Sequence, residues 1–168
     1  MIVLRCVRRL ESRFPFASDV EVEAQRSASE HLSRLGDWYV QPVDLPHHGP
    51  AILCMEERTV AQVLVAADCD DFVTEFGVRY GEVLYNVGIS AAVISAELAA
   101  ARELVFTKTA SRSTLGVLRN CVDYVEYGNE DFPHMSLADV REFANRNISS
   151  VNGYAPIPES LREALTGN

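Results

Sequence analysis

The sequence predicts an α+β fold, with a small amino-terminal antiparallel sheet and one returning strand packed against a mostly helical carboxy-terminal half. Three observations support this prediction. Short β-rich runs separated by turn residues fill positions 1–66, whereas apolar residues recur at helical spacing from position 70 onward. One apolar run, Leu104–Thr109, interrupts the helical part as a returning strand would. With 168 residues, no internal repeat and no linker-like segment, the chain is predicted to form a single domain, residues 1–168.

The first part of the chain mixes extended and irregular segments. Ile2–Cys6 is predicted to form a short strand, and Val7–Phe14 one or two helical turns. Residues 15–34 combine small and charged side chains, which predicts a loop that passes into a helix over Glu23–Leu35. Gly36 is expected to end that helix, because glycine readily takes the left-handed conformation found at helix ends.

Three strands are predicted next. In the first, Trp38, Val40 and Pro42 share one face, and Pro42 indicates an edge strand or a bulge because proline cannot donate a ladder hydrogen bond. The aromatic pair at positions 38–39 is expected to lie buried under the helices, with an exposed interface as the alternative. A turn at residues 47–50 leads to strands over residues 51–55 and 59–66, joined by a hairpin at residues 56–58. These strands would form an antiparallel meander.

The remaining elements are helices with recognisable starts, apart from the strand at Leu104–Thr109. Asp70 or Asp71 is expected to cap a helix that ends at Gly88 and buries an apolar stripe of Phe72, Phe76, Tyr80, Val83, Leu84 and Val87. Ser90 would cap an alanine-rich helix over residues 91–102.

Three further helices follow that returning strand. Ser111 or Ser113 would cap a helix ending at Gly128. Ser136 and Asp139 resemble a capping box that opens a helix reaching about Asn147, and Pro158 marks the start of the last helix.

The composition, 48% apolar and 23% charged, is that of an ordinary globular protein. No run approaches the roughly 18 consecutive apolar residues of a membrane span, and the first thirteen residues interleave charges with apolar side chains, unlike a signal peptide. We therefore expect a cytoplasmic protein that does not enter a membrane.

Four widely spaced cysteines, Cys6, Cys54, Cys69 and Cys121, predict reduced thiols, with a zinc site or a disulfide as the alternative. The acids around Cys69 should raise its pKa and so disfavour a reactive thiolate. No cofactor and no metal ion are expected.

The charge is uneven and points to a candidate ligand site. The formal net charge of −9 disfavours nucleic acid as a general ligand, yet residues 5–13 and 104–122 are both cationic. In the second segment the chain's single lysine lies at a strand-to-helix transition rich in hydroxyl groups, where a helix amino terminus favours an anion. The predicted ligand-binding residues are Thr107, Lys108, Thr109, Ser111, Arg112 and Ser113. The alternative is that the hydroxyls only cap the helix while both cations stay solvated.

Two other groups of residues are candidate sites. His47 and His48 could bind a metal ion or transfer protons, but consecutive residues on an extended chain point apart, which favours an exposed turn. Asp68, Asp70 and Asp71 could bind Mg²⁺, but they lie where helix-capping acids belong.

Four segments carry a family resemblance: "LRCVRRL" after the opening strand, "LGDWYVQPVDL", "ILCMEERTVAQVLV", and the K-T-x-x-R-S run Lys108–Ser113 with Leu115 and Asn120 after it. Together they resemble a family of bacterial and archaeal proteins classed as a domain of unknown function. A related region precedes the main domain in plasmid open-reading-frame-three-type proteins. The resemblance spans roughly residues 1–127 and leaves the helical tail, residues 129–168, uncovered. It implies a setting among plasmids, phages and defence or toxin–antitoxin genes, and it supplies no activity.

No catalytic signature such as GxSxG or HExxH occurs, so no catalytic residue is assigned and enzymatic activity stays open. The favoured hypothesis is a non-enzymatic binding or regulatory module, able to form a homo-oligomer, whose cationic turn engages an anionic ligand or protein partner. The alternatives are an enzyme acting on a phosphorylated substrate, with an acid of residues 68–71 or a histidine as its base, and an antitoxin-like nucleic-acid-associated protein.

Overall fold

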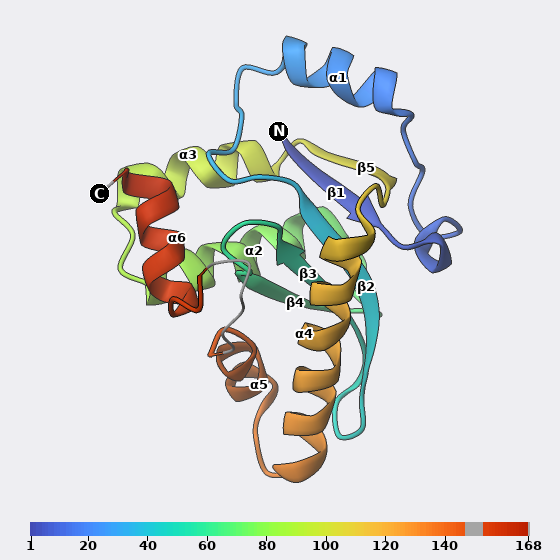
Figure 1. Cartoon of the computed structure of the whole chain (residues 1–168), viewed down its shortest axis with the longest axis vertical. Helices are drawn as coiled ribbons and strands as arrows, with labels where there is room; N and C mark the ends of the chain where they lie inside the picture. Colours follow the sequence, from blue (N-terminus) through green and yellow to red (C-terminus); the bar gives the residue numbers. More distant parts are fainter. Residues whose placement is uncertain (147–152, 168) are drawn as a thin grey trace.

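The structure, a computed structural model, describes residues 1–146 and 153–167. Five strands form one sheet in the order β4-β3-β2-β1-β5 (Figure 1). They are β1 (Ile2–Cys6), β2 (Trp38–Leu45), β3 (Gly49–Glu56), β4 (Gln62–Ala66) and β5 (Leu104–Lys108). The predicted α+β class is confirmed, and β2, β3 and β4 form the predicted antiparallel meander. The sheet as a whole is mixed, because β1 pairs in parallel with both β2 and β5.

A short 3₁₀ helix and six α-helices surround the sheet in the described part of the chain. They are η1 (Arg8–Leu10), α1 (Asp19–Ala28), α2 (Phe72–Asn86), α3 (Ala91–Ala101), α4 (Arg112–Asp131), α5 (Leu137–Ala144) and α6 (Ile157–Thr166). Predicted caps are confirmed at Asp71 and Ser111, whose side chains accept hydrogen bonds from backbone amides of α2 and α4. Ser136 and Asp139 form the predicted capping box of α5. Within residues 1–146 and 153–167, no helix combines the length and apolar composition needed to cross a bilayer.

The helix predicted over Glu23–Leu35 was placed too late in the chain. α1 starts at Asp19, because Ser18 and Glu21 form a capping box in which each side chain bonds the other residue's backbone N–H. The chain leaves the helical conformation after Ala28, and residues 29–37 are irregular. Gly36 therefore does not end this helix.

The predicted end of α4 was wrong for a reason of packing. α4 continues past Gly128 to Asp131. A Cβ atom at Gly128 would lie 2.2 Å from the Phe143 ring, so this glycine allows α5 to pack closely rather than ending α4. α5 ends at Ala144, and the predicted last residue, Asn147, lies outside the described residues.

The hairpin between β3 and β4 is longer than predicted, because β4 begins at Gln62 rather than at Thr59. Val60 has a left-handed φ of 62°, which a β-branched residue rarely adopts. Because this φ lies outside the β region, residue 60 belongs to the turn and not to β4. The buried carboxylate of Glu56 stabilises this turn by accepting hydrogen bonds from the backbone amides of Arg58 and Thr59 and from the Thr59 hydroxyl.

The edge strand predicted from Pro42 is wrong for β2 as a whole, because β2 lies between β1 and β3. At Pro42 itself, however, the strand has one neighbour only. β1 pairs with β2 only at Trp38, Tyr39 and Val40. At Pro42, β2 therefore pairs with β3 alone and is locally an edge, where a missing N–H costs little.

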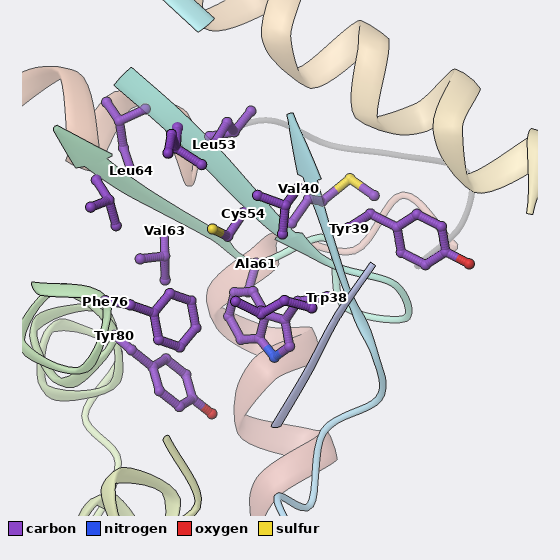
Figure 2. Close-up of a cluster of buried hydrophobic side chains, with 14 of the residues drawn as sticks. Trp38, Tyr39, Val40, Leu53, Cys54, Ala61, Val63, Leu64, Phe76 and Tyr80 are labelled. Carbon is purple, nitrogen blue, oxygen red and sulfur yellow. The ribbon is translucent and has the colours of Figure 1, made fainter. Parts of the chain in front are cut away.

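The two faces of the sheet are covered by different helices. Trp38 is fully buried against Phe76 and Tyr80 of α2, with ring centroids 5.4 and 5.2 Å from its own (Figure 2). Tyr39 points to the other face and is also buried, so the predicted burial of both aromatic residues is confirmed. On that other face α4 packs over the sheet, where the Cys121 Sγ atom lies 3.6 Å from the Met55 Sδ atom.

Both edges of the sheet are covered by side chains or by another chain segment, which limits pairing with other chains. Along β5, the Ala17 amide donates to the Phe106 carbonyl, and the Thr107 hydroxyl donates to the Ala17 carbonyl. Along β4, the Asn145 side chain bonds both the N–H and the C=O of Gln62.

A buried carboxylate fixes the irregular segment that leads into β2. Glu97 of α3 is 1% exposed and accepts hydrogen bonds from the Tyr80 hydroxyl at 2.9 Å, the Ser33 hydroxyl at 2.6 Å and the Arg34 amide at 2.9 Å. Burial and the negative charge of Glu97 hold the pKa of Tyr80 well above its usual range, so its hydroxyl remains a donor.

Tyr80→Phe should lower the free energy of unfolding by about 1.5–3 kcal/mol, because it removes a hydrogen bond to a buried charged group. Urea denaturation followed by circular dichroism measures this. Tyr85→Phe is the matched control on the same helix, since Tyr85 is 76% exposed, and it should change the free energy by less than about 0.5 kcal/mol. Equal effects of the two substitutions would contradict the role given to Tyr80.

Candidate functional site

The pairing of β1 with β5 brings the two cationic segments of the sequence together. The strands run in parallel, with Cys6 opposite Lys108, so their carboxyl ends meet at the same edge of the sheet. Arg8 and Arg9 follow the end of β1 after one intervening residue, and Arg112 opens α4 shortly after β5. We refer to Arg8, Arg9, Lys108 and Arg112 as the cationic end.

The four side chains of the cationic end lie at the surface, where a ligand can reach them. All four residues are exposed. The Lys108 Nζ atom lies 3.8 Å from a Glu11 carboxylate oxygen, and both side chains are largely solvated. Within residues 1–146 and 153–167, no acid lies within ion-pair distance of the three arginines. Their charge is therefore available to an anion.

The other two arginines of the first cationic segment are engaged elsewhere. Arg5 Nε lies 2.5 Å from an Asp37 oxygen, and Arg5 Nη1 lies 3.8 Å from Asp19. Arg13 donates to the Ala67 carbonyl and approaches the Cys69 sulfur at 3.9 Å. Only part of the basic cluster at residues 5–13 thus contributes to the cationic end.

The predicted hydroxyl residues divide into structural and accessible groups. Thr107 is 2% exposed and its hydroxyl is used by the Ala17 carbonyl. The Ser111 Oγ atom caps α4 by accepting from the Thr114 amide and hydroxyl. Ser113 is exposed, with its Oγ 2.9 Å from that of Ser111, and Thr109 is half-buried with its amide donating to the Cys6 carbonyl.

Arg8 and Arg9 were not assigned to the predicted ligand site. The segment that holds them is basic, but the predicted antiparallel sheet gives no reason to place the end of Ile2–Cys6 beside the end of Leu104–Thr109. The usable signal was that both cationic groups follow an apolar strand, which brings them together whenever the two strands pair in parallel.

The histidine and aspartate candidates lie in structural positions. His47 and His48 are exposed at the turn before β3, and His48 Nε2 lies 2.9 Å from the Met135 carbonyl oxygen. The Asp71 carboxylate accepts from the Val73 and Thr74 amides and from the Thr74 hydroxyl. Across the described residues, no three His, Cys, Asp or Glu side chains gather as ligands of one metal ion.

The cysteines, all within the described residues, form no disulfide. Burial raises the pKa of Cys6 to about 12 and holds that of Cys54 well above its usual range. The predicted direction for Cys69 is confirmed, although burial contributes most to its raised pKa, and the charges of Glu75 and Asp68 add to it against the opposing effect of Arg13. None of these three thiols has the lowered pKa of a nucleophilic cysteine.

Ser111→Ala should lower the free energy of unfolding by about 0.5–2 kcal/mol, because it removes the cap of α4. Ser113→Ala is the matched control, since the one hydrogen-bond partner of this exposed hydroxyl among the described residues is the Ser111 hydroxyl, and it should cost less than about 0.5 kcal/mol. Chemical denaturation measures both. If the two substitutions cost the same, Ser111 does not act as the cap.

Comparison with known proteins identifies a family. Residues 3–157 match the family model described as "Domain of unknown function (DUF6933)". No curated protein and no solved structure matches the chain. The matched range extends beyond the residues 1–127 expected from the resemblance, so α5 and the connection to α6 belong to the family pattern as well. The chain thus belongs to this family of domains of unknown function, whose description names no activity.

Proposed function

We propose that this protein is a non-enzymatic binding or regulatory module that holds an anionic group of a ligand or partner protein at its cationic end. The proposal rests on one observation: the parallel register of β1 and β5, with Cys6 opposite Lys108, places two separate basic segments side by side. Of the six predicted ligand-binding residues, we propose that Lys108, Arg112, Ser113 and the half-buried Thr109 contact the ligand, because Thr107 is buried and Ser111 caps α4.

Charge and geometry both support an anionic partner. The protein carries a formal net charge of −9, so a patch of four exposed cations is a local exception on an acidic surface. Three of these cations are arginines, whose planar guanidinium groups bind carboxylates and phosphates through paired hydrogen bonds. The amino terminus of α4, a helix of 20 residues, adds the positive end of its dipole at the same place.

An enzyme acting on a phosphorylated substrate is the second candidate, and one contact favours it. Glu11 lies 3.8 Å from Lys108, so an acid that could transfer a proton sits beside a cation that could hold phosphate. The Asp71 carboxylate, by contrast, is occupied as the cap of α2. Hydrolysis of p-nitrophenyl phosphate that is lost in Glu11→Gln would favour the enzyme over the binding module.

The cellular setting and the assembly of the protein are proposed on sequence grounds. A cytoplasmic location accords with the reduced state expected for its scattered cysteines. The link to plasmid open-reading-frame-three-type proteins, and with it a mobile-element setting and an antitoxin-like role, rests on the segment resemblance alone. Assembly into a homo-oligomer is supported by residues 83–101, which hold one charged residue, Glu97, and that residue is buried.

The binding module is tested with two double variants, Arg8→Ala/Arg9→Ala and Lys108→Ala/Arg112→Ala. Each should weaken binding of a fluorescent hexaglutamate peptide about three- to thirtyfold, because each removes two exposed charges worth a few tenths to 1 kcal/mol apiece. Fluorescence anisotropy at low salt measures the dissociation constants. The control Arg102→Ala/Arg119→Ala removes two exposed arginines elsewhere and should change binding by less than about twofold.

Equal weakening by the control pair would show that net charge alone drives binding. Absence of wild-type binding to the peptide at low salt would contradict the proposal. Binding of single-stranded DNA in preference to the peptide, with a steep loss on adding salt, would favour the nucleic-acid-associated alternative.

A further inference from the structure

A cleft separate from the cationic end lies between α2, β4 and α5. Its volume is about 1020 Å³, which is at the upper end of the range for small-molecule sites, and Pro158 at the start of α6 also borders it. Its walls combine apolar side chains, among them Leu64, Val83 and Val87, with the arginines Arg79 and Arg141.

Arg141 of α5 lacks a full set of partners for its positive charge. Its side chain is 19% exposed, and its Nε atom donates to the Leu64 carbonyl at 3.2 Å. Its nearest acid is Glu75, at 3.8 Å from Nη2, and the same Glu75 oxygen already accepts a hydrogen bond from Arg79 at 2.7 Å. Among the described residues, Nη1 of Arg141 has no hydrogen-bond partner.

The acids near Arg141 do not fully compensate its positive charge. Burial, followed by repulsion from Arg79, lowers the pKa of Arg141 despite the attraction of Glu82 and Glu75. The remaining acids of the cleft are also engaged: Glu142 pairs with Arg146, and Asp139 accepts from Ser136 in the capping box. An anion in the cleft would supply the missing charge.

Gln62 provides a second polar group at the cleft without a partner. It lines the cleft and is 1% exposed, and neither its amide nitrogen nor its amide oxygen has a hydrogen-bond partner among the described residues. The Asn145 side chain bonds the backbone N–H and C=O of Gln62 and does not bond the Gln62 side chain. Native proteins rarely leave a buried amide unsatisfied, so an unpaired glutamine that lines the same cleft as a half-buried arginine is typical of a binding site rather than of a filled core.

We propose that this cleft binds a small organic anion, whose acid group accepts hydrogen bonds from Arg141 and whose apolar body lies against Leu64, Val83 and Val87. Inorganic phosphate alone would leave the apolar wall uncovered, and a neutral apolar molecule would leave Arg141 without its counter-charge. The ligand therefore needs both parts. The proposal concerns a different site from the cationic end and does not depend on it.

The test uses 8-anilinonaphthalene-1-sulfonate, an aromatic sulfonate whose fluorescence rises in apolar surroundings. The folded full chain should bind it saturably with one molecule per chain, and octanoate should displace it while inorganic phosphate at equal concentration should not. Arg141→Met keeps the aliphatic stem and removes the charge, so it should weaken binding at least about tenfold, as expected for a lost charge-assisted hydrogen bond.

One further variant and two controls keep the test decisive. Val83→Trp places a large side chain in the cleft from a half-buried position on α2 and should abolish binding even if Arg141→Met is poorly folded. The controls, Arg102→Met and the combined substitution of the cationic end by alanine, should leave binding within about twofold of the wild type. Binding that survives both Arg141→Met and Val83→Trp, or displacement by phosphate as effective as by octanoate, would overturn the proposal.

Discussion

Parallel pairing of β1 with β2 on one side and with β5 on the other is the interaction on which the rest of the structure depends. β1 has five residues, and Ile2, Val3, Leu4 and Cys6 are each no more than 3% exposed. Such a strand is buried on both faces only if both are covered: Ile2, Leu4 and Cys6 join the main core cluster, whereas Val3 packs with Val22 of α1 on the other face. The same pairing directs the carboxyl ends of β1 and β5 to one edge of the sheet and so creates the cationic end.

The charged side chains of this protein fall into two groups: those that bond to other residues of the fold, and those whose charge is free to interact with a ligand. Arg5 pairs with Asp37, Glu97 holds the segment before β2, and Glu56 shapes the turn after β3. Their removal would leave buried partners unsatisfied, which is costly. Arg8, Arg9 and Arg112 form no ion pair within residues 1–146 and 153–167, and the charge of Arg141 is only partly compensated. This division separates residues that maintain the fold from those that can bind something else.

Local signals were enough to predict most of the elements, whereas contacts between distant segments were not. The helix starts at Asp71, Ser111 and Ser136 can be predicted because a capping side chain bonds backbone amides two or three residues away. The capping box of Ser18 and Glu21 is an equally local signal, but the start of α1 was not predicted from it. By contrast, the parallel partner of β1, the use of Thr107 by Ala17 and the packing of Phe143 against Gly128 depend on residues 15 to about 100 positions apart. The sequence accordingly predicts only the β5–α4 half of the site proposed above.

The most direct measurement of the central claim is an amide-resolved NMR titration of the full chain with hexaglutamate. If β1 and β5 together form one anion site, amides of residues 7–9 and of residues 108–113 should shift along the same saturation curve with one dissociation constant. Shifts confined to the start of α4, or different dissociation constants for the two segments, would contradict the claim that the register of β1 and β5 builds a single site.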